Sequence, residues 1–403
     1  MSPHLPEEEP PPDGSLPDRA VAAVAQHPLS VYVHVPFCAT RCGYCDFNTY
    51  TADELGAAPG SSRDAYLDAV ERELALAHQV LGEDVPPVTT VFFGGGTPTL
   101  LRPAEQARLL AAVRTALPLA DGAEITTEAN PESVDADHLG ALVAAGFTRI
   151  SFGMQSAVTP VLARLDREHT PGRVPQVVAW ARAAGFASVS LDLIYGTPGE
   201  TLDEWRASLD AALACAPDHV SAYALALEPG TRMAADIRRG RLPEIDLDHQ
   251  AAQYELADQL LAQAGMSAYE ISNWARPGQE CRHNLAYWRS QHWWGVGPGA
   301  HSHVGGVRWW NVKHPGTYSQ RLLGGGSPAA GRETLSDEQR RVERILLEIR
   351  IADGLDLGLL TGSERARISG FVDRDVLTVH DDRAVLTAAG RLLADGIVRD
   401  LLD

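Results

Sequence analysis

The stretch SVYVHVPFCATRCGYC, at residues 30–45, decides the fold assignment because it joins a strand-like segment to three closely spaced cysteines. Its first six residues alternate between polar and apolar side chains, as expected of a strand. Cys38, Cys42 and Cys45 follow, separated by three and then two residues. A loop this short can bring three thiolates to one metal centre. The stretch therefore predicts a metal site at the carboxyl end of the first strand.

The spacing of these cysteines favours an iron–sulfur cluster over structural zinc. Three thiolates can each hold one iron of a 4Fe-4S cluster and leave the fourth iron open for a chelating ligand. The alternative is a zinc site in which His34 completes the ligand set of the three cysteines. That histidine would lie within the strand, and the C-x3-C-x2-C spacing differs from the paired C-x2-C of zinc knuckles. We therefore expect Cys38, Cys42 and Cys45 to hold a 4Fe-4S cluster.

Strand-like and helix-like segments alternate from residue 30 to residue 228. This alternation is typical of βαβ units and predicts a parallel sheet. The six strand candidates are residues 30–35, 88–93, 124–128, 148–152, 187–194 and 220–225. A complete barrel needs eight such units, so the pattern predicts an α/β fold with a partial (β/α)6 barrel. Its chemistry is expected at the carboxyl ends of the strands.

The chain changes character after residue 228. Residues 229–323, rich in Trp, His and Gly, are expected to form an accessory α+β segment, and residues 324–328 a linker. Residues 335–403 begin with a capping box, Ser336 and Gln339, and end in a hairpin and a helix, which predicts a winged-helix-like C-terminal domain. Acidic residues outnumber arginines in this domain, which favours partner docking over DNA binding.

Composition limits the partners of this 403-residue chain. Its 34 Lys and Arg against 53 Asp and Glu give a net charge of −19, which repels polyphosphates, so we expect no nucleic-acid partner. No apolar run approaches the roughly 18 residues of a membrane span, which leaves only peripheral membrane association open. Residues 1–29 are acidic and Pro-rich and have no signal-peptide pattern. They are expected to be a disordered tail on a cytoplasmic protein.

Five motifs occur in a fixed order around and after the cysteines. They are YVHVPFC (32–38), FGGGTPT (93–99), EANP (128–131), SFGMQS (151–156) and DLIYGTPG (192–199). Together with the cysteine spacing, they resemble the radical S-adenosylmethionine (SAM) superfamily, and within it the oxygen-independent coproporphyrinogen III oxidases and their relatives. The resemblance implies that S-adenosyl-L-methionine chelates the open iron and is cleaved to methionine and a 5′-deoxyadenosyl radical, with electrons from a separate donor.

The residues at the strand ends suit a SAM site. Glycines allow a ligand to approach the backbone closely, an Arg fork suits a carboxylate, and an Asp can accept from ribose hydroxyls. Taken singly, each of these polar residues is equally consistent with a surface loop or a helix cap. From the residues and the family resemblance, we expect SAM contacts from Tyr32, Tyr44, Gly95, Gly96, Thr97, Glu128, Gln155, Arg167 and Asp192.

Two features separate the chain from the oxidases. The oxidases carry a fourth cysteine two residues after the third, and here Phe47 takes that place. The segment CRHNLAYW, at residues 281–288, contains the H-N-x-x-Y-W motif. Both features resemble the HemW branch of the family, whose members are regarded as heme chaperones.

The second motif suits a porphyrin. His283 can ligate iron, Tyr287 and Trp288 offer flat apolar surfaces, and Cys281 is a second soft donor. The alternative is an aromatic subdomain in which the histidine and its neighbour are only hydrogen-bonded. The expected heme-site residues are His283, Asn284, Tyr287 and Trp288.

Three functions remain open at this stage. The first is a heme carrier on a radical-SAM scaffold, which hands heme to acceptor proteins. The second is a coproporphyrinogen III dehydrogenase-like oxidoreductase of porphyrin biosynthesis, which would decarboxylate coproporphyrinogen III to protoporphyrinogen IX. The third is a zinc-structured binding protein without redox chemistry. Phe47 and the H-N-x-x-Y-W motif favour the first.

Overall fold

A computed structural model describes residues 8–25, 27–56, 59–167, 170 and 172–403, and their strands form two sheets. The larger sheet has twelve strands in the order β12-β11-β10-β9-β1-β2-β3-β4-β5-β6-β8-β7. The smaller has three, in the order β13-β15-β14. Among the described residues, no helix is both long enough and apolar enough to cross a membrane.

The centre of the large sheet confirms the predicted parallel strands. They are β1 (Leu29–Val35), β2 (Val88–Gly95), β3 (Leu119–Ala129), β4 (Arg149–Gln155), β5 (Ser188–Tyr195) and β6 (His219–Ala224). Each pairs in parallel with the next along the chain. The fold is therefore the expected α/β partial barrel of six parallel strands, and the carboxyl ends of these strands share one edge.

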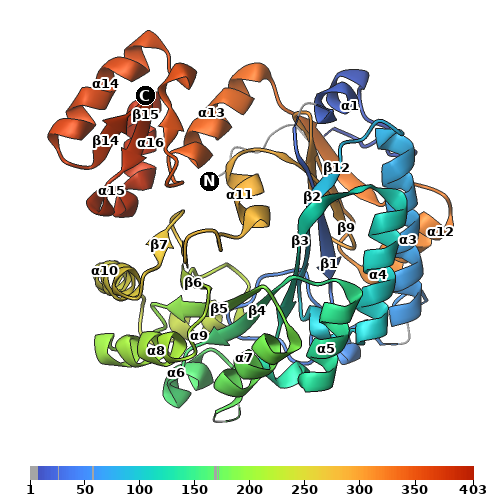
Figure 1. Ribbon diagram of the computed structural model, residues 1–403, viewed down its shortest axis with the longest axis horizontal. Coiled ribbons are helices and arrows are strands. Elements are labelled where there is room, and N and C mark those ends of the chain that lie inside the picture. Colours follow the sequence, from blue (N-terminus) through green and yellow to red (C-terminus); the bar gives the residue numbers. More distant parts are fainter. Residues whose placement is uncertain (1–7, 26, 57–58, 168–169, 171) are drawn as a thin grey trace.

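Helices cover the outer face of this sheet (Figure 1). The main ones are α3 (Arg63–Leu81), α4 (Pro103–Ala116), α5 (Ala136–Ala145), α7 (Arg173–Ala184) and α8 (Leu202–Ala214). Shorter elements of this half are α2 (Ala52–Leu55), η1 (Pro98–Leu100), η2 (Pro131–Ser133) and α6 (Thr159–Arg164). On β4, the buried Ile150 and Phe152 belong to the core that these helices cover. The alternate residues of the same strand line a cavity on the inner side of the sheet.

The accessory region extends the same sheet at both edges. Its strands are β7 (Ser267–Ala268), β8 (Asn273–Ala275), β9 (His292–Val296), β10 (His301–Val304) and β11 (Val307–Asn311), followed by β12 (Ala329–Thr334). β8 runs antiparallel to β6, and β9 runs parallel to β1. Its helices are α9 (Arg232–Arg238), α10 (Leu247–Gln263), α11 (Arg282–Trp288) and α12 (Pro315–Leu323). Because β12 pairs with β11, residues 324–328 connect α12 to a strand of the same sheet and are not the domain linker we expected.

The disorder expected for residues 1–29 is wrong for the part of this segment that the structure describes. Helix α1 (Asp18–Val24) buries Ala20 and Val24 and lies beside β10 and α3. Glu8 forms a β-bridge and an ion pair with Arg332 of β12. The apolar run that forms α1 gives this acidic segment a surface to bury, which overrides the composition signal. Residues 1–7 of the expected tail lie outside the described residues.

The C-terminal unit has its own core and matches the helix-and-hairpin prediction. Its elements are α13 (Asp337–Glu348), β13 (Leu355–Asp356), η3 (Leu357–Leu359), α14 (Gly362–Asp373), β14 (Leu377–His380), β15 (Arg383–Leu386), α15 (Ala388–Leu392) and α16 (Ala394–Leu402). Ile345, Phe371 and Leu401 belong to a buried cluster of this unit. The single final helix we expected is two helices that meet at Leu393.

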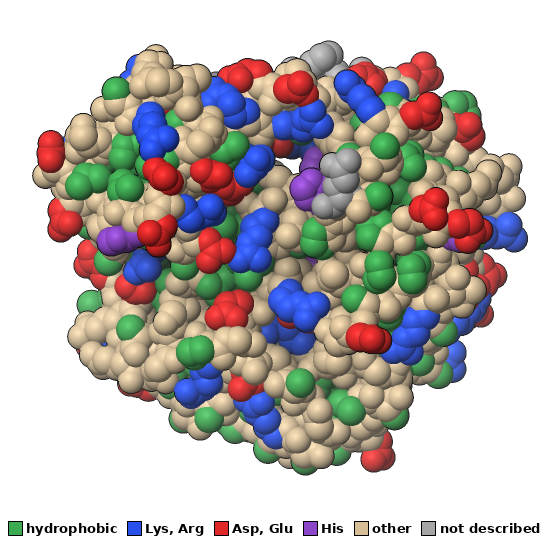
Figure 2. Space-filling view, turned by 45° about the horizontal axis from the view of Figure 1, so that its top comes forward, with side chains coloured by type: hydrophobic (Ala, Val, Ile, Leu, Met, Phe, Trp, Pro, Cys, Tyr) green, Lys and Arg blue, Asp and Glu red, His purple; other side chains and the backbone are tan. Residues whose placement is uncertain are grey.

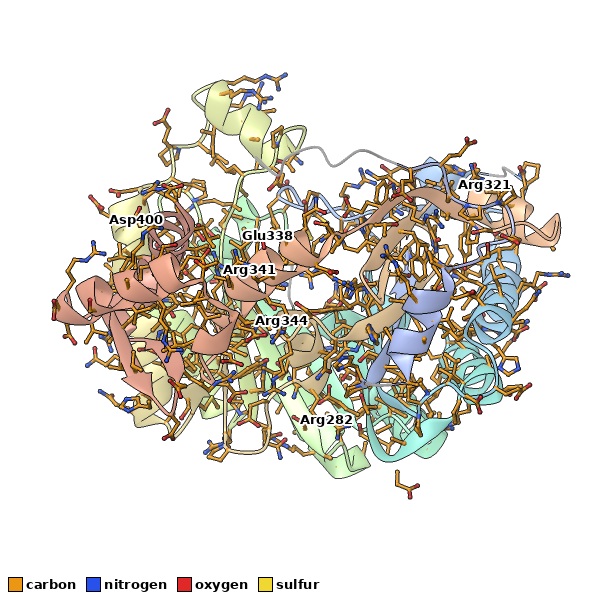
Figure 3. The ribbon with its side chains drawn as sticks, turned by 90° about the horizontal axis from the view of Figure 1, so that it is seen from above. Arg282, Arg321, Glu338, Arg341, Arg344 and Asp400 are labelled. Atoms are coloured by element: carbon orange, nitrogen blue, oxygen red, sulfur yellow. The ribbon has the colours of Figure 1, made fainter. Side chains whose placement is uncertain are left out.

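Ion pairs hold the unit together and dock it on the accessory region. Arg341 of α13, beside Glu338 in Figure 3, also pairs with Glu364 of α14 at 2.8 Å. Arg391 of α15 pairs with Asp258 of α10. Charges of both signs are interspersed over the face in Figure 2, and that face is hollowed near its middle.

Candidate cofactor and ligand site

One cavity of about 520 Å³ opens on the inner side of the parallel strands. Its wall combines the cysteine loop after β1, the ends of β2 to β6, and one face of α11. Every residue predicted for the cluster, SAM and heme lines this cavity, with the single exception of Trp288. A volume of this size is typical of a small-molecule or cofactor site.

The cysteine loop places Cys38, Cys42 and Cys45 on one wall of the cavity. Arg167 donates from Nη1 to the Cys42 Sγ at 3.6 Å. The Thr49 hydroxyl is buried at this wall without a partner, although it can donate toward Cys38 and Cys45. Burial raises the pKa of the Cys38 and Cys45 thiols, and hydrogen bonding opposes the shift. These three soft donors, with spare hydrogen-bond donors beside them, fit an iron–sulfur cluster.

The zinc alternative loses its fourth ligand, because His34 does not line the cavity wall on which the three cysteines lie. Both ring nitrogens of His34 are engaged, Nδ1 with the Tyr32 hydroxyl at 3.0 Å and Nε2 with the Asn48 carbonyl at 2.9 Å. The ring is also buried, which lowers its pKa.

The glycines after β2 let two loops pack backbone to backbone. Gly96 donates to the Val35 carbonyl at 2.8 Å, and Thr97 donates to the Phe37 carbonyl at 2.7 Å. A Cβ on Gly96 would lie 2.5 Å from the Phe37 oxygen. Gly95 has a φ of +109°, which only glycine adopts readily. The glycines therefore fix the cysteine loop against β2 and also line the cavity.

Two partly buried carboxyls give the cavity an acceptor-rich side. Glu128 accepts from the Gly95 N–H at 3.2 Å, and burial raises its pKa to about 8, with Asp192 adding to the shift. Asp192 accepts from the hydroxyls of Ser151 and Ser221 at 2.9 and 2.8 Å. Burial also raises the pKa of Asp192. This side suits a ligand that carries hydroxyls, an ammonium or a sulfonium.

The other predicted SAM residues join this side. Arg167 donates to the Gly153 carbonyl at 3.2 Å, and its buried Nε has no partner. Gln155, at the end of β4, has a φ of +63°, which turns the chain at the cavity edge. Tyr44 lines the cavity beside the cysteines, and Tyr32 lies stacked on Phe92. The nine residues predicted for SAM are thus brought together.

Helix α11 enters the cavity wall from the accessory region. Glu124 of β3 accepts from the first two N–H groups of the helix, those of Arg282 and His283, at 3.0 Å each. Arg282, labelled in Figure 3, also donates to the Gly122 and Thr89 carbonyls. A carboxylate at a helix N-terminus is favourable both for the free N–H groups and for the helix dipole. The helix start is therefore fixed to β2 and β3.

His283 is buried and hydrogen-bonded at both ring nitrogens. Its Nδ1 lies 2.7 Å from the Thr90 hydroxyl oxygen. That hydroxyl donates its hydrogen to the Ser30 hydroxyl, so it can only accept from His283. Nδ1 must therefore be the protonated nitrogen, and Nε2 accepts from the Tyr287 hydroxyl at 2.9 Å. Burial lowers the pKa of His283 to about 3, so the ring is neutral. This is the hydrogen-bonded arrangement that the sequence left open as the alternative to iron ligation.

Trp288 departs from the expected heme site. With about 100° between successive helical residues, Tyr287 lies between His283 and Asn284 around the helix, whereas Trp288 lies beyond Asn284 and does not line the cavity. Tyr287 lies one turn after His283 and shares its face. Phe92, stacked on His283 at 5.1 Å, supplies the second aromatic surface instead. Asn284 does line the cavity, where it donates to the Tyr269 hydroxyl and to Glu270.

Sequence reasoning missed the polar lining of the barrel interior. The missed residues are Arg149, Ser151, Ser190, His219, Ser221, Tyr223, Tyr269 and Asn273. A signal was available, because polar side chains recur at every second position of β4, β5 and β6 where a strand buried on both faces would be apolar throughout. Such a period marks an inner face that meets a ligand or solvent.

Comparison with known proteins identifies the family of this chain. Residues 32–212 match the model of the radical SAM superfamily. "Heme chaperone HemW" of Mycobacterium tuberculosis is 52% identical over 95% of this chain and 97% of its own length, and that of Bacillus subtilis is 35% identical over 91% and 97%. A solved structure of coproporphyrinogen III oxidase (HemN) from Escherichia coli, a radical SAM enzyme, has a TM-score of 0.80 and 25% identity over 95% of this chain and 92% of that one.

These matches span both the parallel barrel and the accessory region that carries α11. The identity to the curated relatives over nearly the whole chain assigns its branch as well as its superfamily. The chain belongs to the HemW family of radical SAM proteins.

Proposed function

We propose that this protein is a heme carrier, which binds heme at α11 and passes it to heme-accepting proteins. The observation that carries the proposal is the shared cavity, in which the cysteine loop and the inner face of α11 line one continuous wall. The names of the curated relatives support the same function.

Cys38, Cys42 and Cys45 would hold a 4Fe-4S cluster, whose reduced form can supply the electron that cleaves SAM. Arg167 would fork onto the SAM carboxylate, and Asp192 would accept from the ribose hydroxyls. Glu128 would face the positive end of the ligand, since it is the second partly buried carboxyl on that side. An electron donor is needed for any turnover of SAM.

Heme would take its axial bond from the Nε2 of His283. Nε2 is the nitrogen with the lone pair, because Nδ1 carries the ring proton. The Tyr287 hydroxyl now occupies that lone pair, so it must turn away before iron can bind. Phe92 and Tyr32 offer stacked rings along the same wall. The neutral imidazole needs no deprotonation, which leaves the hydroxyl as the group that iron displaces.

Heme titration of the cluster-reconstituted protein under anaerobic conditions tests this proposal. We expect a saturable Soret band at one heme per chain, which His283→Ala shifts or abolishes while iron and sulfide content stay constant. A matched control is His138→Ala, since that histidine lies outside the cavity lining. Axial ligation by His283 is wrong if His283→Ala binds heme with unchanged affinity and spectrum.

A second candidate function is the oxidative decarboxylation of coproporphyrinogen III in porphyrin biosynthesis. The similarity to the HemN structure and the set of nine SAM residues in one cavity favour it. Against it, Phe47 is 64% exposed at the cavity and stands where the oxidases have a fourth cysteine. Incubation with coproporphyrinogen III, SAM and dithionite decides between them, because only the enzyme would yield protoporphyrinogen IX.

A further inference from the structure

A buried arginine that forms no ion pair with any described residue lies inside the barrel. Arg149, the first residue of β4, is 3% exposed and lines the cavity. Its Nη1 donates to the Ser188 hydroxyl at 2.8 Å and to the Gln279 carbonyl at 3.2 Å. Its Nε has no hydrogen-bond partner. A buried guanidinium held only by neutral groups is costly, so a cavity that contains one is prepared for an anion.

The two carboxylates that raise the pKa of Arg149 accept hydrogen bonds from other groups. Glu124 accepts from the backbone of α11, and Asp192 accepts from two serine hydroxyls. Both act on Arg149 only through space, and neither forms an ion pair with it among the described residues. Burial opposes the charged form, but nearby acidic groups raise the pKa of Arg149 through space, so the guanidinium is charged and no described carboxylate contacts it.

A hydrogen-bonded relay beside Arg149 adds a second donor. His219 joins the Ser190 hydroxyl at 2.8 Å to the Tyr269 hydroxyl at 2.9 Å, and burial lowers its pKa, so the ring is neutral. The two hydroxyls and the neutral imidazole each carry one polar hydrogen, which makes three hydrogens for the two hydrogen bonds that join Ser190, His219 and Tyr269. Whichever tautomer the histidine adopts, one hydroxyl hydrogen is left over. Both hydroxyl-bearing residues line the cavity.

The relay is tied to the proposed heme site. Asn284, the neighbour of His283 on α11, donates to the Tyr269 hydroxyl at 3.2 Å. That bond fills an acceptor position of Tyr269 and leaves the surplus hydrogen of the relay in place. The cavity thus has an acceptor-rich side, at Glu128 and Asp192, and a donor-rich side, at Arg149 and the relay.

We propose that this donor-rich side, formed by Arg149 with Ser190, His219 and Tyr269, binds a carboxylate of the porphyrin cargo, an assignment that rests on the heme-carrier function proposed above. A guanidinium N–H and a hydroxyl are the donor pair that a carboxylate accepts with both oxygens. Such a contact orients the macrocycle in its plane, whereas His283 fixes only its centre. The porphyrin edge that carries the acidic side chains would point toward β4 and β5.

The test compares hemin with hemin dimethyl ester, in which both carboxylates are masked, by Soret titration of the full-length reconstituted protein. The wild type should bind hemin about ten- to a hundredfold more tightly than the ester. Arg149→Gln should lose that preference by weakening hemin binding and leaving ester binding unchanged. A matched control is Arg173→Gln, because Arg173 donates to the Pro131 and Val134 carbonyls outside the cavity lining and should keep the preference.

The wild type alone keeps the proposal falsifiable if Arg149→Gln does not fold. Free propionate at millimolar concentration should compete with hemin and not with the ester. Equal affinity for hemin and ester would overturn the carboxylate site while the heme-carrier function stands. An Arg149→Gln variant that keeps the preference would also overturn it. Failure of both ligands to bind would refute the carrier function itself, and the carboxylate assignment with it.

Discussion

Tyr287→Phe, which removes a single oxygen atom, tests the proposed iron ligation by His283. The substitution removes the hydroxyl that donates to the Nε2 of His283 at 2.9 Å and keeps the ring that packs edge-on against the imidazole at 5.0 Å. In the ligand-free protein, Nε2 is then buried without a partner. Because iron would satisfy the same lone pair, the substitution raises the free energy of the ligand-free state more than that of the heme-bound state.

The size of the effect follows from this hydrogen bond. A buried polar atom that loses its partner costs about 1–3 kcal/mol. Since the variant can relax in part, we expect 1–2 kcal/mol to appear as tighter binding, which is about 5- to 30-fold in the dissociation constant. The variant should also be destabilised without heme by a similar amount.

The assay is anaerobic Soret titration of the wild type and Tyr287→Phe, with urea unfolding of both ligand-free proteins. Tyr254→Phe is the matched control, because its buried hydroxyl has no partner and lies outside the cavity lining. It should leave heme affinity unchanged and should not lose stability, because its hydroxyl has no hydrogen bond to lose. Weaker heme binding by Tyr287→Phe would refute the competition between hydroxyl and iron, and would show that the hydroxyl contributes to the bound state.

Three further predictions address the rest of the cavity. Cys38→Ala should lose most of the iron and sulfide of the reconstituted protein, measured chemically, whereas Cys215→Ala should retain both. Asp192→Asn should weaken SAM binding by about one to two orders of magnitude with the cluster intact, as measured by calorimetry, because it removes charge from two or more hydrogen bonds. The pKa of the Glu128 carboxyl is about 8 in the folded protein, against 4.5 normally. Below pH 4.5 the carboxyl is protonated in both the folded and the unfolded state. As the pH rises from 4.5 toward 8, the unfolded chain loses this proton first, so the folded state loses stability. Glu128→Gln should therefore match the wild type near pH 5 and become more stable by roughly 2–4 kcal/mol at pH 8 in urea unfolding, and equal stability at both pH values would contradict the buried-carboxylate argument.

Local patterns in the sequence were sufficient for the six parallel strands and for the C-terminal hairpin. Each βαβ unit lies within a short stretch of chain, and the turn at Asp381 and Asp382 adopts the positive φ values that Asp tolerates. The cysteine spacing and the strand-end motifs also brought the SAM residues to the same edge, because parallel strands share that edge.

The sequence could not reveal how the accessory strands extend the sheet. β9 pairs with β1 across more than 200 residues, and β7 and β8 have only two and three residues, too few to show a period. The side of α11 that faces the cavity was also undetermined, so the sequence predicted Tyr287 and Trp288 together, although Trp288 does not line the cavity. Both are questions of tertiary packing, which a local pattern does not encode.

The polar side chains on the inner face of β4 to β6 could also have been predicted from the sequence. Arg149, Ser190 and His219 occupy alternate positions of strands that were correctly located. A charge at an inward-facing position of a central strand needs a partner or a ligand, and the residue pattern alone gives that information.

The central claim, that this protein carries heme and releases it, is tested most directly by heme transfer. Heme-loaded protein is mixed with an apo-globin under anaerobic conditions, and the Soret band is followed over time. We predict that the band moves to that of the holo-globin at a rate that depends on the apo-globin concentration, as expected of hand-over between proteins. A rate that equals spontaneous heme loss at every apo-globin concentration, or the absence of any saturable heme loading, would contradict the account.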